Sequence, residues 1–132
     1  MKKLIVASFL LATSGLVAQA ADEPPQWMQD VFAGQELQAA WQEYQTVYKN
    51  PDAALDAKTK QLIALGVAAQ IPCQYCALGH TMGAQKAGAS EQEIKEAVAV
   101  AAQVRKLSTM LNGLQYDMDK FKAQVGAPPA SN

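Results

Sequence analysis

The placement of the prolines constrains the fold of this chain more than any other feature. All six prolines stand at the edges of long proline-free stretches, at Pro24, Pro25, Pro51, Pro72, Pro128 and Pro129. Because proline breaks a helix interior, the stretches between them are free to be helical. They are rich in Ala and Gln, which favour helices, and none of them alternates apolar and polar residues with a period of two. The sequence therefore predicts an all-α fold with about five to six helices in one domain.

Local signals place these helices along the chain. Apolar residues recur at steps of three or four over residues 26–48, with Gly34 as a point where this stretch can divide into two shorter helices. Asp56 is a predicted N-cap, Gly88 a predicted C-terminal cap, and Ser90 opens a predicted capping box. Further helices are therefore predicted from Asp56 to about Gln70, from Pro72 to Gly88, from Ser90 toward Leu111, and from beyond Asn112-Gly113 to about Gln124.

The first twenty residues are predicted to be a secretory signal. Lys2 and Lys3 form a short positive region, residues 4–17 are almost uncharged and apolar, and Ala18-Gln19-Ala20 fits a cleavage site. A retained membrane anchor is the alternative, but this apolar stretch is shorter than a spanning helix needs. We therefore expect cleavage after Ala20 and a periplasmic or secreted protein. Residues 21–50 then form an N-terminal helical segment, residues 51–124 complete the domain as its core, and residues 125–132 are a flexible tail.

Size and charge restrict the partners. The 132 residues suit a single domain, and a chain of this size gains core by self-association. Its formal net charge is −1 and it contains no basic run. A nucleic-acid partner is not expected, because that function needs a basic patch.

The chemically informative segment begins at Cys73. The chain has only two cysteines and one histidine, and Cys73, Cys76 and His80 stand at positions i, i+3 and i+7 on one predicted helix face. A position near the helix N-terminus favours a thiolate at Cys73. His80, one turn after Cys76, can accept the proton of that thiol. This arrangement favours a redox dithiol that closes a Cys73–Cys76 disulfide.

Other interpretations of the same residues are open. The disulfide can be merely structural, although so short a loop constrains the unfolded chain little, and His80 can be a core histidine. Structural zinc needs a fourth ligand, and the chain has no further cysteine or histidine, so no metal is expected. Covalent haem attachment needs histidine directly after the second cysteine, where Ala77 stands. No cofactor is therefore expected.

Three motifs in order carry a family resemblance. The run from Leu55 to Leu65, then Cys73-x-x-Cys76-x-x-x-His80, and then the stretch from Ala84 to Ala97 resemble the carboxymuconolactone decarboxylase family, most closely its alkylhydroperoxidase D (AhpD) branch. The resemblance implies an all-helical fold that assembles as trimers or hexamers, and a dithiol peroxidase of peroxiredoxin type. It also implies that Cys76 is the peroxidatic thiol, Cys73 the resolving thiol and His80 part of a proton relay.

The chain departs from this family pattern at one relay position. Gln61 stands where the relay has a glutamate, twelve residues before Cys73. An amide can orient a histidine but cannot take a proton. Three functions therefore remain open: hydroperoxide reduction with an unidentified electron-donor dithiol, thiol-disulfide exchange without peroxidase activity, and a non-enzymatic helical oligomer with a structural disulfide.

Overall fold

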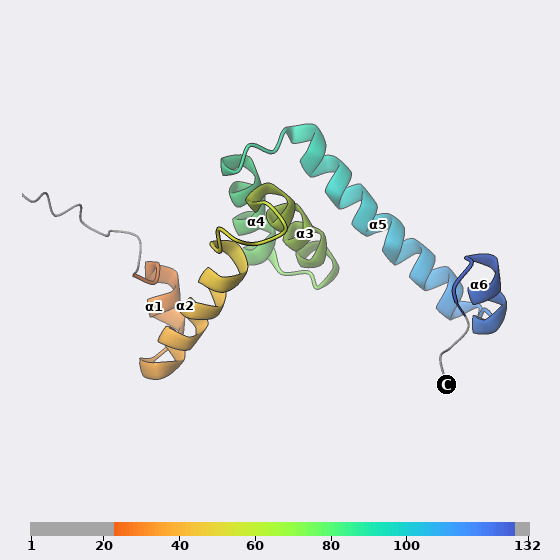
Figure 1. The fold of residues 1–132 in the computed structure, drawn as a ribbon, viewed down its shortest axis with the longest axis horizontal. Coiled ribbons are helices and arrows are strands. Elements are labelled where there is room, and N and C mark those ends of the chain that lie inside the picture. The colour runs from red at the N-terminus through yellow and green to blue at the C-terminus, as the bar shows by residue number, and fades with distance from the viewer. Residues whose placement is uncertain (1–22, 129–132) are drawn as a thin grey trace, which may run out of the picture. The chain divides into compact units, whose positions relative to one another are not determined.

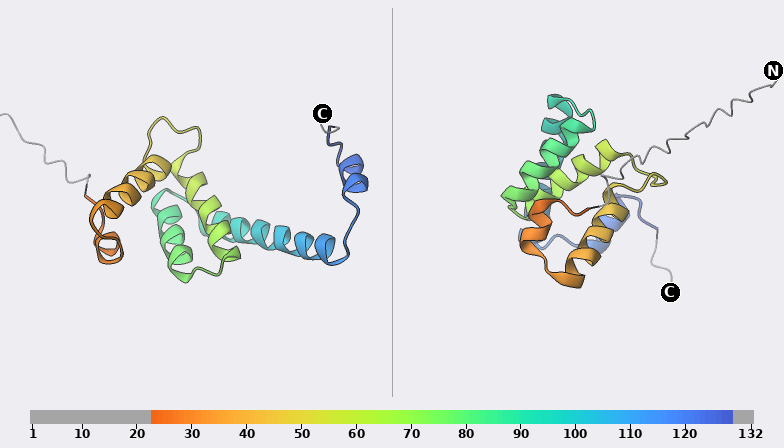
Figure 2. Two further views of the ribbon diagram at one scale, coloured as in Figure 1. Left: turned by 90° about the horizontal axis from the view of Figure 1, so that it is seen from below. Right: turned by 90° about the vertical axis from the view of Figure 1, so that its left-hand side faces the viewer.

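The computed structural model of the chain describes residues 23–128, and over these residues the fold is entirely helical. Figures 1 and 2 show the helices, which are α1 (Gln26–Val31), α2 (Gly34–Tyr48), α3 (Ala57–Gln70), α4 (Gln74–Lys86), α5 (Glu91–Gly113) and α6 (Met118–Gln124). The predicted all-α class is confirmed for this part of the chain. The predicted signal, residues 1–20, and the last four residues lie outside it. Within residues 23–128, no helix has both the length and the apolar character to cross a membrane.

The helix ends follow the local signals in the sequence. The Asp56 carboxylate accepts the Thr59 N–H at 2.7 Å and caps α3. At the start of α5 the Ser90 hydroxyl accepts the Glu93 N–H at 3.1 Å, while the Glu93 carboxylate accepts the Ser90 N–H at 2.7 Å, which completes the capping box. Gly88 after α4 has a φ of +84°, a conformation that glycine adopts without strain. The predicted boundaries are therefore close to the observed ones.

The chain divides into two compact units, up to Glu43 and from Tyr44 onward. In the first unit the break expected at Gly34 is present, because α1 ends at Val31 and α2 begins at Gly34 with a φ of +52°. Met28 and Trp41 are the buried apolar residues among its described residues.

In the second unit α3 is the central helix and packs against both α4 and α5. The buried residues among the described residues of this unit are Leu65 and Ala68 on α3 and Ala84 on α4. Small residues bring the helices close together. A Cβ on Gly66, for example, would already lie 3.6 Å from the Cβ of Ala101 on α5.

Polar contacts fix α3 to α5 at both ends. At the first turns Lys58 Nζ donates to Glu93 Oε1 at 2.7 Å. At the last turn Arg105 Nε donates to Gln70 Oε1 at 2.6 Å, and its guanidinium also donates to the Gln70 carbonyl at 3.0 Å. The second contact satisfies a carbonyl that the end of α3 leaves without a helical partner. These contacts hold α3 at both ends, and the cysteines follow directly after it.

Candidate functional site

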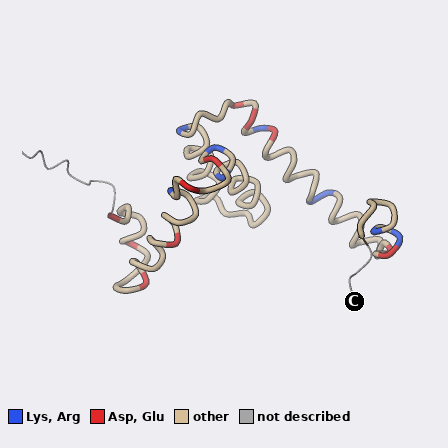
Figure 3. Tube along the Cα trace, viewed as in Figure 1, with Lys and Arg blue, Asp and Glu red and all other residues tan. Residues whose placement is uncertain are grey.

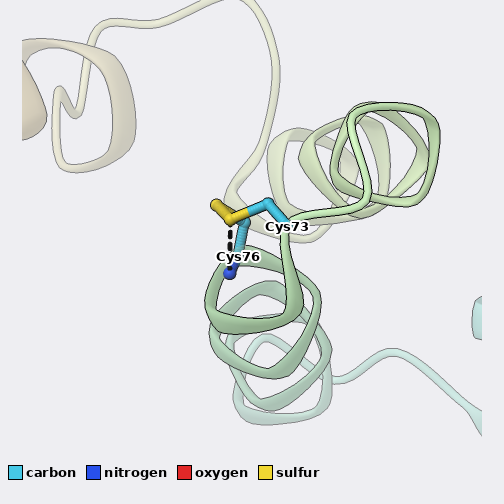
Figure 4. The surroundings of a disulfide bond; sticks show 2 residues. All are labelled: Cys73 and Cys76. Atoms are coloured by element: carbon cyan, nitrogen blue, oxygen red, sulfur yellow. Dashed lines mark hydrogen bonds between the residues drawn. A yellow bond between two sulfur atoms is a disulfide. The ribbon is translucent and has the colours of Figure 1, made fainter.

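The two cysteines form a disulfide at the start of α4 (Figure 4). Their Cα atoms are 5.3 Å apart, and both residues are half-buried. The sequence predicted a CxxC at a helix N-terminus, and the structure confirms this placement.

Cys73 is itself the N-cap of α4. Its backbone is extended, its carbonyl accepts the Ala77 N–H at 2.9 Å, and its Sγ accepts the Cys76 N–H at 3.2 Å. The dashed line in Figure 4 marks this last contact. A sulfur in the N-cap position meets the unpaired N–H groups and the positive end of the helix dipole, both of which stabilise a thiolate. The geometry therefore favours negative charge on Cys73 once the disulfide is reduced.

His80 is held from the opposite helix by Gln61. The imidazole Nδ1 lies 2.8 Å from Gln61 Oε1, so α4 and α3 each contribute one partner. Because an amide oxygen only accepts, Nδ1 carries the hydrogen and Nε2 is left as the basic nitrogen. Burial lowers the pKa of His80, so the ring is neutral at pH 7. The arrangement presents a neutral imidazole that can take up a proton at Nε2.

Gly83 makes room for the Gln61 amide. A Cβ at position 83 would lie 2.6 Å from Gln61 Oε1 and 2.7 Å from its Cδ, closer than atoms can approach. The glycine stands three residues after His80 on α4, so it faces the same neighbour. This role of Gly83 was not predicted from the sequence. The available signal was a glycine inside a helix, where it costs about 1 kcal/mol relative to alanine.

Tyr48 completes the surroundings of His80. The two ring centroids are 5.6 Å apart with the planes tilted by 31°, and the centroid of the Tyr44 ring lies 4.9 Å from that of Tyr48. Burial and the neighbouring Tyr44 raise the pKa of Tyr48, so its phenol stays protonated. From the sequence, Tyr48 was predicted only to belong to the apolar pattern of residues 26–48, because a contact between α2 and α4 has no local signature.

The predicted site residues therefore form two joined pairs. Cys73 is bonded to Cys76, and His80 is hydrogen-bonded to Gln61. No hydrogen bond joins His80 to either sulfur in the described part of the chain. His80 lies four residues, about one helical turn, after Cys76 on α4. Residues 23–128 also contain no cluster of three His, Cys, Asp or Glu side chains arranged to hold a metal ion.

Comparison with known proteins agrees with these features. The chain is 50% identical over 54 residues to "Uncharacterized protein 4 in cox locus" of Paracoccus denitrificans, a match that covers 41% of this chain and 49% of that protein. The match thus spans about half the length of this curated relative. No solved structure matches the chain. The model of the carboxymuconolactone decarboxylase family matches residues 35–116, which include the disulfide, His80 and Gln61. The matched residues make up more than half of the chain, and the chain therefore belongs to the carboxymuconolactone decarboxylase family.

Proposed function

We propose that this protein is an exported, AhpD-like thiol oxidoreductase that reduces hydroperoxides through a Cys73–Cys76 dithiol-disulfide cycle. The observation that carries the proposal is the disulfide at the N-terminus of α4, on the helix that also presents a neutral His80 held by Gln61. In this pair the Cys73 sulfur is stabilised as a thiolate, and the Cys76 sulfur belongs to the residue one turn before the base His80.

The cycle has two oxidative steps. His80 Nε2 takes the proton of the Cys76 thiol, and the thiolate attacks the terminal oxygen of the hydroperoxide. The O–O bond breaks, the leaving alkoxide takes the proton from His80, and Cys76 becomes a sulfenic acid. Cys73 then attacks the Cys76 sulfur, water leaves, and the disulfide forms. A donor dithiol supplies the two electrons and two protons that restore both thiols.

Gln61 is proposed to position His80 without sharing its proton. The amide fixes the ring through Nδ1, but it supplies no negative charge to stabilise the imidazolium that forms in the first step. General-base assistance of this kind is worth about 10²- to 10⁴-fold in rate. We therefore expect the wild-type peroxidase reaction to be slow and a carboxylate at position 61 to accelerate it.

Thiol-disulfide exchange without peroxidase activity is the second candidate function. The Cys76 N–H on Cys73 Sγ favours it, because exchange requires a stabilised thiolate but no carboxylate relay. In this function the Cys73 thiolate attacks a disulfide, its partner thiolate leaves, and Cys76 then displaces the second thiolate.

A single-turnover experiment tests the proposal. The reduced protein is mixed with excess hydroperoxide in a stopped-flow instrument, and thiol loss is followed from pH 5 to 9 for the wild type, Cys76→Ser and Gln61→Glu. We expect oxidation that is lost in Cys76→Ser and accelerated at least tenfold in Gln61→Glu, a change that lies within the range for general-base assistance. Gln85→Glu, which adds the same charge at an exposed position of α4, is the control and should match the wild type.

Two outcomes contradict the peroxidase proposal. Wild-type oxidation no faster than that of a free thiol of equal pKa, with no gain in Gln61→Glu, leaves disulfide exchange as the function. A reduction potential below about −300 mV, combined with inertness toward small disulfides, would indicate a structural disulfide and overturn both candidates.

A further inference from the structure

Tyr48, whose ring lies against His80, also lines a cavity. It has a volume of about 480 Å³ and is formed by the end of α2, the loop that follows and the first turn of α3. Its walls are both polar and apolar, with Tyr48, Asn50, Leu55 and Lys60 among the lining residues. A cavity of this size is large enough for a small organic ligand.

The charges around this cavity are mainly positive. Lys49 and Lys60 both line it, whereas Asp56 is the single acid among its lining residues. The Asp56 carboxylate is already engaged, because it accepts the Thr59 N–H and caps α3. Lys60 is half-buried, and no hydrogen bond or ion pair joins its side-chain ammonium to another described residue. Lys58, two residues earlier, differs in being paired with Glu93 outside the cavity.

One ring contact and one pair of sequence neighbours relate this cavity to the redox site. Tyr48 lines the cavity and also lies against the His80 ring, at 5.6 Å between centroids. Lys60 lines it and is followed directly by Gln61, which holds His80 Nδ1. A ligand in the cavity can therefore contact Tyr48, which in turn contacts His80.

We propose that this cavity binds the anionic end of the substrate, a small organic carboxylate whose hydroperoxide or disulfide group reacts at the cysteines, with Lys60 as the main anion-binding residue. The inference rests on the proposed function, since it names the substrate class of that dithiol. The Lys60 ammonium supplies a charge-assisted hydrogen bond, and the apolar part of the lining contacts the carbon skeleton of the ligand.

A charge series of small disulfides tests this assignment. The purified, reduced protein is mixed separately with dithiodipropionate, which carries two carboxylates, with bis(2-hydroxyethyl) disulfide, which is neutral, and with cystamine, which carries two ammonium groups. Each rate constant is divided by that of 2-mercaptoethanol with the same disulfide, which removes the intrinsic reactivity of the reagent. We expect the corrected rate to be highest for dithiodipropionate and lowest for cystamine.

Substitution then identifies the residue responsible. Lys60→Gln should lower the ratio of the corrected dithiodipropionate rate to the neutral rate about tenfold, the effect of losing one charge-assisted hydrogen bond. Lys58→Gln removes the same charge from the same helix outside the cavity and should leave that ratio unchanged. Equal corrected rates for the three disulfides, or an equal fall of the ratio in both variants, would overturn the proposal.

The binding site is also testable if the dithiol proves inert. The oxidised protein is titrated with hexanoate while backbone and side-chain NMR signals are recorded. Saturable shifts at Lys60 and Tyr48 in the wild type, with no shift at Tyr48 in Lys60→Gln, would support the cavity as an anion site even if the redox function fails. The absence of such shifts up to 10 mM hexanoate, in a protein whose thiols do react, would refute the anion site and leave the redox function in place.

Discussion

At the scale of single residues, the two cysteines differ in their surroundings. Cys73 Sγ accepts a main-chain N–H from the first turn of α4, while Cys76 lies within that turn and supplies the N–H. The sequence predicted a thiolate-stabilising position from Pro72 and the helix start alone, because this effect depends only on local backbone geometry. The structure identifies the Cys76 N–H as the donor that would stabilise a Cys73 thiolate.

We predict that Cys73 is the more acidic thiol of the reduced protein. In Cys76→Ser the backbone N–H remains, so the thiol pKa of Cys73 should lie below that of a free cysteine. In Cys73→Ser the Cys76 thiol should titrate at a higher pH. Both values follow from the pH dependence of alkylation by iodoacetamide. A lower pKa for Cys76 than for Cys73 would contradict this assignment and place the stabilised charge next to His80.

Gly83 and Gly79 differ in the space around them. Both glycines lie inside α4, but a Cβ at position 79 would meet open space, whereas one at position 83 would collide with the Gln61 amide. Gly79→Ala should therefore stabilise the protein by about 0.5–1 kcal/mol through helix propensity. Gly83→Ala should displace Gln61 and release His80 Nδ1, despite the same gain in propensity.

Nitrogen NMR of His80 and thermal unfolding distinguish the two variants. Wild type and Gly79→Ala should show the tautomer with the hydrogen on Nδ1, and Gly83→Ala should show a mixture with the other tautomer. A single Nδ1–H tautomer in Gly83→Ala would mean that Gln61 does not determine the state of the ring.

At the scale of helices, local sequence signals predicted where the helices end but not which residues make contacts between helices. Asp56, Ser90 and Gly88 mark helix ends because capping depends on residues three or four positions apart. The position of Gln61 opposite His80 was available only through the family resemblance. Gly83 and Tyr48 were missed because their roles arise where α4 meets α3 and α2, and such contacts have no sequence period.

Glu93 joins two helices and should make stability depend on pH. Its carboxylate accepts from Lys58 Nζ on α3 and from the Ser90 N–H, and these contacts lower its pKa to about 2 from 4.5. Because the folded pKa is depressed, the stabilisation is fully present above pH 4.5 and is lost as the pH falls from 4.5 toward 2. Glu93→Gln should therefore lose stability at pH 7 and show a flatter pH profile in this acid range.

Urea unfolding between pH 2 and 7 measures this contribution. Glu96→Gln, an exposed acid on the same helix that accepts only from the neighbouring Gln92, is the matched control and should follow the wild-type profile. Parallel profiles for Glu93→Gln and the wild type across this range would show that the pair of Lys58 and Glu93 does not stabilise the fold.

At the scale of the whole molecule, the second unit buries few apolar side chains and leaves many exposed. Among its described residues Leu65, Ala68 and Ala84 are buried, and α5 has no buried residue among its 23 residues. The charged residues of α5 cluster in its first turns and at Arg105 and Lys106, and the rest of the helix is uncharged (Figure 3). Exposed apolar side chains occur on each helix of this unit beyond α2, including Ile63, Val67, Leu78, Met82, Val100, Val104, Leu107, Met110 and Phe121.

The outer faces of α3 and α5 meet in an apolar groove. This groove has a volume of about 440 Å³, and Ile63, Val67, Val100 and Val104 are among its lining residues. Val104 is 61% exposed and Val100 65%. Exposed apolar residues that lie together mark sites of protein–protein contact. A chain of this length buries only part of its apolar surface when it folds alone, and contact with another copy of itself buries more. We therefore predict that the protein is a homo-oligomer, a trimer or hexamer as the family resemblance implies, with this groove inside the interface.

A charge placed in the groove tests the assembly. Val104→Glu puts a carboxylate where the interface is predicted, and a buried unpaired charge is costly enough to dissociate a small oligomer. We expect light scattering after size exclusion to show a trimer or hexamer for the wild type and a monomer for Val104→Glu, with a lower melting temperature. Lys106→Glu adds negative charge on another face of α5 and should keep the oligomer. A wild-type monomer, or an intact oligomer in Val104→Glu, would mean that this groove is not where copies of the chain meet.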